Sequence, residues 1–199
     1  MSAQPKYAMT PEDYLVFERA SDEKHEYVDG EIYAMTGGSP EHNAIGAALI
    51  GLLFTQLRKR PCNVYTSDQR VKVSARQYYY PDVTVVCGTP DFESQRGGVS
   101  LTNPTVIIEV LSPSTEHYDR WTKAAYYAAL PSLQDYLFVA QDQMSVELYS
   151  RNPEGAWIFK LATEKEMTLQ IPSIDCTLTL ADIYEKVIFL PAENRLSDE

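Results

Sequence analysis

One acidic residue in an otherwise apolar segment is the most informative residue of this chain. Glu109 lies within Thr105–Leu111, TVIIEVL, and such a run is typical of a central strand covered on both faces. A carboxylate in that place loses its hydration, which is costly unless protonation, a salt bridge or a bound metal ion compensates it. Asp82 follows Pro81 and opens the apolar segment VTVV, where a proline is tolerated at the start of a strand. Strands lying side by side would bring the two acids together.

Asp82 and Glu109 form a candidate metal site. Two carboxylates about 4 Å apart repel each other by roughly 1 kcal/mol in water and roughly 4 kcal/mol at an effective dielectric of 20. A divalent cation turns that repulsion into attraction, and oxygen ligands without a cysteine or histidine cluster favour Mg²⁺ or Mn²⁺ over Zn²⁺. Such an ion suits phosphodiester hydrolysis. The structural alternative is that Asp82 is a strand-entry turn residue and Glu109 an ion-pair partner.

Lys123 also has two interpretations. It follows Asp119 by four residues in YDRWTK, which on an exposed helix gives a pair worth a few tenths of a kcal/mol. A helix packed over the sheet would instead direct the ammonium toward Glu109 and a bound phosphate. Considered alone, the surface pair is favoured.

The elements that must position these residues follow from spacing and turn signals. Thr10 caps a short helix to Glu18, Asp29-Gly30 indicates a type I′ hairpin, and apolar residues from Ile45 to Leu57 recur at helical spacing. The remaining predictions are strands near 64–65, 70–73, 79–87, 105–111, 136–140, 146–150, 156–161 and 167–171, a loop at 88–103, and helices at 118–130 and 180–187.

This element order predicts an α/β (α+β) fold, a mixed sheet flanked by helices and extended by an antiparallel meander. At 199 residues, we expect one domain over residues 1–190 and a polar tail over 191–199. The fourteen tyrosines favour core or interface packing over stacking on bases.

Composition limits the setting in which the protein acts. No run approaches the ~20 apolar residues of a membrane helix, and the N-terminus lacks the pattern of a secretion signal, so we expect a cytoplasmic protein. Cys62, Cys87 and Cys176 are odd in number and widely spaced, which indicates reduced, structural thiols.

The charge is unusual for a protein that binds DNA. Seventeen Lys and Arg against 28 Asp and Glu give a formal charge of −11, whereas such proteins are usually basic. Screening over about 8 Å at physiological salt lets a local basic patch act despite distant acids. The candidates are Arg58–Arg60 and the set Arg70, Lys72 and Arg76, and each is interpreted first as a solvated face.

Four segments together carry a resemblance to a known family. They are KHEYVDGEIYAMTGGSPEHN, YYYPDVTVVCG, NPTVIIEVLSPSTEHYDRWTK and SLQDYLFV. In sequence and order they closely resemble the Uma family of restriction-endonuclease-like proteins, from about Tyr14 to Val187. That family is assigned to the PD-(D/E)XK nuclease superfamily, so the resemblance implies a mixed sheet between helices, Mg²⁺-dependent cleavage of DNA and a homodimer.

The resemblance assigns roles residue by residue. Pro81 and Asp82 match the PD element, and Glu109 matches the acid that follows it. The ExK spacing expects a lysine where this chain has Leu111, so Lys123 in the DRxxK element is the candidate relocated lysine. This departure puts catalytic competence in question, though not the fold.

Two further residues come from the same matched segments. Glu26 is the acid of the HEY(V/I)DG hairpin and is a candidate fourth catalytic residue, with an exposed hairpin acid as the slightly favoured alternative. His42 could face the same cleft, although a helix-capping or surface histidine is favoured. Ser112 and Thr115 suit either a phosphate contact or a turn and cap.

Three functions are compared. The preferred one is a Mg²⁺- or Mn²⁺-dependent endonuclease acting on DNA, in which Asp82 and Glu109 hold the metal, Lys123 acts on water or the transition state, and Glu26 is an optional fourth member. Leu111 and the acidic charge motivate the second, a binding or regulatory protein with a nuclease fold and weak or no cleavage. A two-carboxylate glycosidase has no supporting motif.

Overall fold

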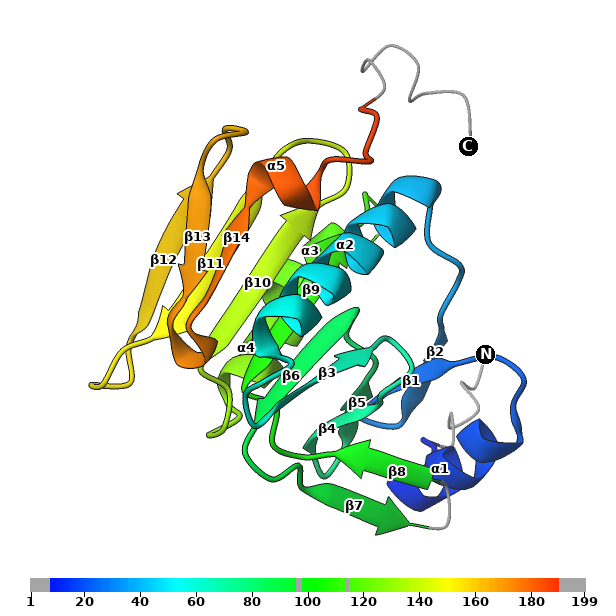
Figure 1. The fold of residues 1–199 in the computed structure, drawn as a ribbon. Coiled ribbons are helices and arrows are strands. Elements are labelled where there is room, and N and C mark those ends of the chain that lie inside the picture. Colours follow the sequence, from blue (N-terminus) through cyan, green and yellow to red (C-terminus); the bar gives the residue numbers. More distant parts are fainter. Residues whose placement is uncertain (1–7, 96–97, 114, 190–199) are drawn as a thin grey trace.

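The computed structural model describes residues 8–95, 98–113 and 115–189 and contains two six-stranded sheets and a two-stranded ribbon (Figure 1). The polar tail predicted at 191–199 lies outside these residues. The larger core belongs to the sheet ordered β12-β11-β10-β9-β6-β3. Its strands are β3 (Cys62–Thr66), β6 (Val83–Cys87), β9 (Val106–Leu111), β10 (Asp135–Ala140), β11 (Val146–Arg151) and β12 (Trp157–Ala162).

Helices cover both faces of this central sheet, as the sequence predicts. On one face lie α2 (Pro40–Leu57), the ribbon β13 (Thr168–Ile171) and β14 (Cys176–Thr179), and α5 (Leu180–Ile183). On the other lie α3 (Glu116–Tyr118), a π-helical segment (Asp119–Lys123) and α4 (Ala124–Ala128). Figure 1 shows α2 in front of β9 and β6, with α3 and α4 behind them.

The long helix α2 forms because its sequence gives it a cap and one apolar face. The Ser39 hydroxyl accepts a hydrogen bond from the His42 amide at 3.1 Å, and Pro40 occupies the first turn, where its missing N–H is not needed. The side chains that recur at helical spacing are all fully or almost fully buried: Ile45, Leu49, Leu53 and Leu57. They pack on β6, β9 and β10.

β9 is buried along its whole length, so the prediction of a doubly covered central strand is confirmed. It pairs in parallel with β10 and antiparallel with β6. Alternation sends Ile108 and Val110 to the core under α2, whereas Ile107 and Leu111 face the opposite core. Glu109 therefore points toward the π-helical segment and α4.

The second sheet, ordered β2-β1-β5-β4-β8-β7, packs tyrosines against α1 (Pro11–Ala20). Its strands are β1 (His25–Val28), β2 (Glu31–Ala34), β4 (Val71–Ser74), β5 (Gln77–Tyr79), β7 (Phe92–Gln95) and β8 (Gly98–Leu101). Tyr14, Tyr27 and Tyr78 form a buried cluster of rings, which confirms core packing as the use of these aromatics. At the predicted hairpin, Asp29 and Gly30 have φ of 50° and 104°, as a type I′ turn requires.

Several predicted boundaries are wrong. Residues 88–103 are not all loop, because Phe92 pairs with Leu101 and β7 and β8 form a hairpin at the sheet edge. The strand predicted at 79–87 is divided at Tyr80-Pro81-Asp82 between the two sheets. Among residues 8–95, 98–113 and 115–189, none of the helices has the length and hydropathy of a membrane-spanning segment.

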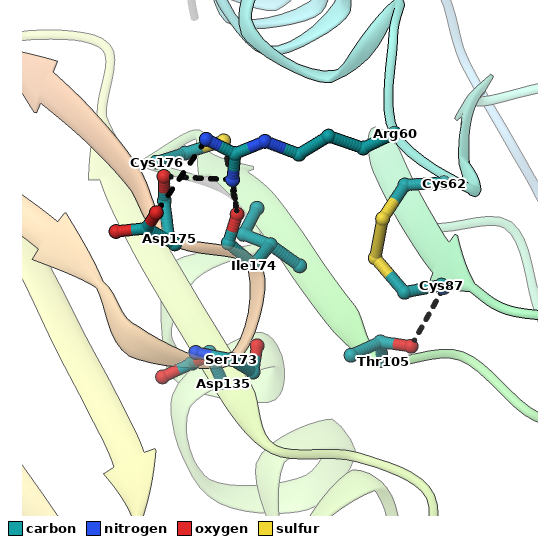
Figure 2. Close-up of a disulfide and its surroundings, with 9 residues drawn as sticks. All are labelled: Arg60, Cys62, Cys87, Thr105, Asp135, Ser173, Ile174, Asp175 and Cys176. Atoms are coloured by element: carbon teal, nitrogen blue, oxygen red, sulfur yellow. Dashed lines mark hydrogen bonds and ion pairs between the residues drawn. A yellow bond between two sulfur atoms is a disulfide. The ribbon is translucent and has the colours of Figure 1, made fainter.

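The prediction that all three cysteines are reduced is also wrong. Cys62 and Cys87 are directly opposite in the β3–β6 pair, with Cα atoms 4.0 Å apart, and form a disulfide (Figure 2). Spacing along the chain could not indicate this pairing, because sheet register brings together residues 25 positions apart. Cys176 is a buried free thiol, as expected. Beside the disulfide, Arg60 binds the carbonyl oxygens of Ile174 and Asp175.

Removing the disulfide should destabilise the fold through the unfolded state. The bond closes a 25-residue separation, for which loop-closure entropy predicts roughly 3 kcal/mol. We expect the Cys62→Ala/Cys87→Ala variant to lose about that much free energy of unfolding in urea relative to oxidised protein. A reductant should lower the stability of wild type but leave the variant unchanged. Equal stability of oxidised and reduced wild type would contradict this account.

Candidate active site

Glu109 is a buried carboxylate held by groups from the helical layer. Its residue is 4 % exposed, and the Tyr127 hydroxyl donates to its Oε1 atom at 3.1 Å. Burial raises the pKa of Glu109 well above its ordinary value, and the Lys123 charge opposes that shift. A hydrogen-bonded, partly compensated acid of this kind is what the sequence predicts at the centre of β9.

Lys123 joins three carboxylates in one buried cluster. Its Nζ atom lies 2.8 Å from Glu26 Oε1, 3.2 Å from Asp119 Oδ1 and 3.6 Å from Glu109 Oε1. All four side chains are at most 8 % exposed. Burial alone would lower the pKa of Lys123, but the charges of Glu109, Glu26 and Asp119 raise it well above the ordinary value. The ammonium therefore stays charged.

The favoured interpretation of Asp119 and Lys123 as a surface pair is wrong. Both residues are buried, because α3, the π-helical segment and α4 pack directly over the sheet. The Ala124 amide donates to the Asp119 carbonyl, one residue further than in an α-helix. Such π turns are rare and frequently found at functional sites.

Glu26 reaches the cluster from the other sheet. It lies on β1, which pairs with both β2 and β5, and its Oε1 atom accepts a hydrogen bond from the Tyr80 amide at 3.3 Å. Burial raises the pKa of Glu26 against the opposing charge of Lys123. The favoured alternative of an exposed hairpin acid is therefore wrong, because β1 is an interior strand of its sheet.

Asp82 borders the cluster at the point where β6 begins. The β6–β9 register pairs Val83 with Ile108, so Asp82, one residue before β6, lies at the level of Glu109 in the neighbouring strand. The Asp82 Oδ2 atom accepts a hydrogen bond from the Val110 amide at 2.7 Å. The negative charge of Asp82 is among the influences that raise the pKa of Glu109.

His42 is the second partner of Asp82. Its Nε2 atom lies 3.3 Å from Asp82 Oδ2, and the hydrogen bond to Asp82 raises the pKa of His42 although burial opposes the shift. Gly38 makes this position possible, because a Cβ there would lie 2.7 Å from His42 Nδ1. The favoured expectation of a surface or capping histidine is therefore wrong: its backbone is capped, but its ring faces the site.

Two residues of the site are not among those predicted from the sequence, which gives Asp119 only as a surface partner of Lys123. Asp119 belongs to the carboxylate cluster itself, and Tyr127 holds Glu109. The sequence does contain a signal for both residues: positions 119, 123 and 127 recur every four residues, so the side chains of Asp119 and Tyr127 share one helix face with Lys123. By contrast, Leu111 packs in the apolar core of that face, which leaves the charge beside Glu109 to Lys123. Ser112 and Thr115 bond to each other at 2.9 Å in a turn.

The donor set fits a hard divalent cation. Four carboxylates, from Glu26, Asp82, Glu109 and Asp119, face one lysine and one histidine, so negative charge is in excess. Within the described ranges, no three His, Cys, Asp or Glu side chains form a ready metal cage. Mg²⁺ needs no such cage, because it usually keeps several waters and takes one or two carboxylates. Asp82 and Glu109 would supply those two.

The predicted basic candidates are mostly engaged in structural contacts. Arg70 is buried rather than solvated, and its guanidinium donates to Ser100. Lys72 pairs with Glu93, Arg76 with Asp29, and Arg60 with Asp175.

Replacing Lys123 by Met should leave buried acids without compensation. We expect a loss of about 3–5 kcal/mol in the free energy of unfolding at neutral pH. The loss should shrink as the pH falls, because carboxyls whose folded pKa is raised above the ordinary 4.5 destabilise the fold only where they are charged in the unfolded state. Urea titrations across pH measure this. Lys186→Met, at a 79 % exposed side chain, is the matched control, and equal losses in both variants would contradict the account.

The chain matches known proteins over most of its length. The family described as "Uma2: Putative restriction endonuclease" matches residues 11–181. An uncharacterized protein of Synechocystis sp., slr1290, is 39% identical over 182 residues, covering 91% of this chain and 94% of the relative. A second Synechocystis protein, sll1609, is 34% identical over 151 residues, covering 75% and 85% respectively.

The fold also matches a solved structure. The crystal structure of a "putative nuclease belonging to DUF820" from Anabaena variabilis superposes with a TM-score of 0.68 over 83% of this chain and 92% of that chain, at 16% identity. At that identity the likeness concerns the fold alone, and it confirms the restriction-endonuclease-like architecture expected from the sequence. With the family match over residues 11–181 and two relatives above 30% identity, the chain belongs to the Uma2 family of putative restriction endonucleases.

Proposed function

We propose that this protein is a metal-dependent endonuclease that hydrolyses DNA phosphodiester bonds. The observation that carries the proposal is the cluster in which Lys123 contacts Glu26, Glu109 and Asp119, with the Asp82 carboxylate close enough to Glu109 to raise its pKa. A structural ion pair needs one acid for each base, and this cluster has more acids than bases. An excess of carboxylates at the entry to a central strand suits a site that binds a cation.

The open side of the cluster lies at Asp82. The Asp82 and His42 side chains are 16% and 21% exposed, whereas the Lys123 side chain is 8% exposed. We infer that substrate approaches from this side and that Lys123 forms the inner wall. Asp82 is held by the Val110 amide, so its carboxylate is oriented before anything binds.

Asp82 and Glu109 are the proposed ligands of Mg²⁺ or Mn²⁺. When bound, such an ion orients and acidifies a water and stabilises charge developing on a phosphate. The Tyr127 hydroxyl fixes one Glu109 oxygen, and the charge of Lys123 opposes the rise in pKa that burial gives Glu26 and Glu109. A water or phosphate oxygen held beside Glu109 would also lie within reach of the Lys123 ammonium. Lys123 would then take the role that the ExK lysine fills in the superfamily. Glu26 is a proposed fourth member, acting through Lys123.

The competing proposal is a binding or regulatory protein that retains the fold without cleavage. The acidic charge and the paired state of Arg60, Lys72 and Arg76 favour it. Cation binding is common to both proposals if the site is retained, so turnover of DNA is what separates them.

We further propose that the protein acts in the cytoplasm as a homodimer. A reducing cytoplasm would hold Cys62 and Cys87 as two thiols, so the redox state of this pair in cells also tests the proposed compartment.

Neutralising either proposed ligand should abolish cleavage while the fold persists. With Mg²⁺ or Mn²⁺, we expect Asp82→Asn and Glu109→Gln to cut double- or single-stranded DNA at least about 100-fold more slowly than wild type, since even partners of metal ligands contribute 10–100-fold. The heat of Mn²⁺ binding in calorimetry should fall in parallel. Asp175→Asn, at an exposed acid beyond the site, is the matched control.

Three outcomes are informative. Cleavage by wild type that both variants retain would contradict the site assignment. Mn²⁺ binding by clean wild-type protein without any cleavage would favour the regulatory alternative. Circular dichroism of each variant separates loss of function from loss of fold.

A further inference from the structure

At the edge of the central sheet formed by β11 and β12, one face is not covered by helices and exposes an apolar, largely aromatic patch. We define this aromatic patch as Trp121, Tyr149, Trp157, Phe159 and Leu161. Tyr149 stands opposite Phe159 in the β11–β12 register, and their rings are 5.1 Å apart. Trp157 and Leu161 alternate with Phe159 on the same face of β12. β12 is the outer strand of the sheet, at its left edge in Figure 1. The helical layer therefore covers β10 but leaves β12 open.

The patch combines a projecting ring with a recess. Trp121 is 70 % exposed and stands beside a cavity of about 300 Å³. Apart from Trp121 itself, aromatic rings supply much of the wall of this cavity, namely those of Tyr136, Phe138, Tyr149 and Trp157. A large apolar projection next to a large apolar recess is a self-complementary surface.

The exposed area of the patch is comparable to that of the largest apolar patches on monomers, which are often functional. Phe159 is 51 % and Leu161 47 % exposed, and aromatic side chains of this kind bury 150–250 Å² each when covered. The patch then exposes roughly 400 Å², which lies within the ~300–600 Å² of the largest patches on monomers, often functional ones. It is also about half of the ~800 Å² that each partner contributes to a standard interface.

The charges around the patch favour a protein over a nucleic acid as its occupant. Arg120 pairs with Glu116 at 2.7 Å and with Glu147 at 2.6 Å. Arg151 donates to the carbonyl oxygens of Ala128 and Leu133. A phosphate backbone would meet carboxylates here and cations that are already engaged, whereas nucleic-acid binding depends on cations available to phosphate.

We propose that the aromatic patch is the interface between two copies of this chain, with Trp121 of each copy entering the recess of the other. A two-fold interface needs one patch that contains both complementary shapes, which the projecting ring and the cavity provide. The copies pack by their faces rather than by adding strands, because exposed Lys160 in the middle of β12 disfavours edge-to-edge pairing.

This inference gives a surface to the homodimer of the proposed function and does not depend on nuclease chemistry. The helix stripe with Asp119, Lys123 and Tyr127 faces the active site, whereas Arg120, Trp121 and Ala124 line the recess. Variants in the patch can therefore alter assembly without altering a proposed ligand.

Sedimentation equilibrium of the full chain tests the proposal. Wild type should have the mass of a dimer, and Trp121→Glu and Phe159→Glu should each reduce it to the mass of a monomer, because each would place a charge in an apolar interface. Phe54→Glu on α2 and Val99→Glu on β8 alter similarly exposed apolar side chains elsewhere and should leave the dimer intact. Circular dichroism checks that each variant is folded.

Tryptophan fluorescence provides an independent reading. The chain has two tryptophans, and both belong to the patch, so diluting wild type until it dissociates should shift the emission to longer wavelength. A wild type that is monomeric at every concentration, or a dimer that survives both patch variants, would overturn the proposal. Quenching of the tryptophans by an oligonucleotide bound to monomeric protein would also overturn it and assign the face to nucleic acid.

Discussion

One buried ammonium in contact with three carboxylates links the two sheets and the helical layer of this protein. Lys123 draws Glu26 from one sheet, Glu109 from the other and Asp119 from the helical layer. Without the charge of Lys123, burial of these acids would be costly, and the packing of the two sheets and the helical layer at this point would be destabilised. The same contact leaves an excess of negative charge beside Asp82. The residues that stabilise the fold at this point are therefore also the ones that we propose to bind a cation.

Each of the two sheets positions different residues of this site. The central sheet fixes Asp82 and Glu109 through strand register, and its apolar neighbours under α2 hold β9 in place. The second sheet supplies Glu26 and, through its tyrosine cluster, keeps β1 buried. The break at Tyr80-Pro81-Asp82, where the chain leaves β5 and enters β6, joins them. A proline there removes one amide donor and ends the first strand before the acid.

The sequence indicates the parts of this arrangement that local patterns determine. The caps and apolar face of α2, the hairpin at Asp29-Gly30 and the buried run around Glu109 follow from short-range rules and are found as expected. Burial of Glu26 and His42 depends on which strands become neighbours, which spacing cannot state. The Cys62–Cys87 pair and the hairpin within 88–103 likewise follow from sheet register. Tertiary pairing decided each missed assignment.

We propose that Asp82 and Glu109 bind a divalent cation beside the carboxylates that surround Lys123. Diffraction from crystals grown with Mn²⁺, measured at a wavelength where manganese scatters anomalously, would test this proposal. We expect an anomalous peak in contact with carboxylate oxygens of both Asp82 and Glu109, and no such peak in crystals of Glu109→Gln. Manganese bound only elsewhere on the protein, with these two acids unliganded, would contradict it.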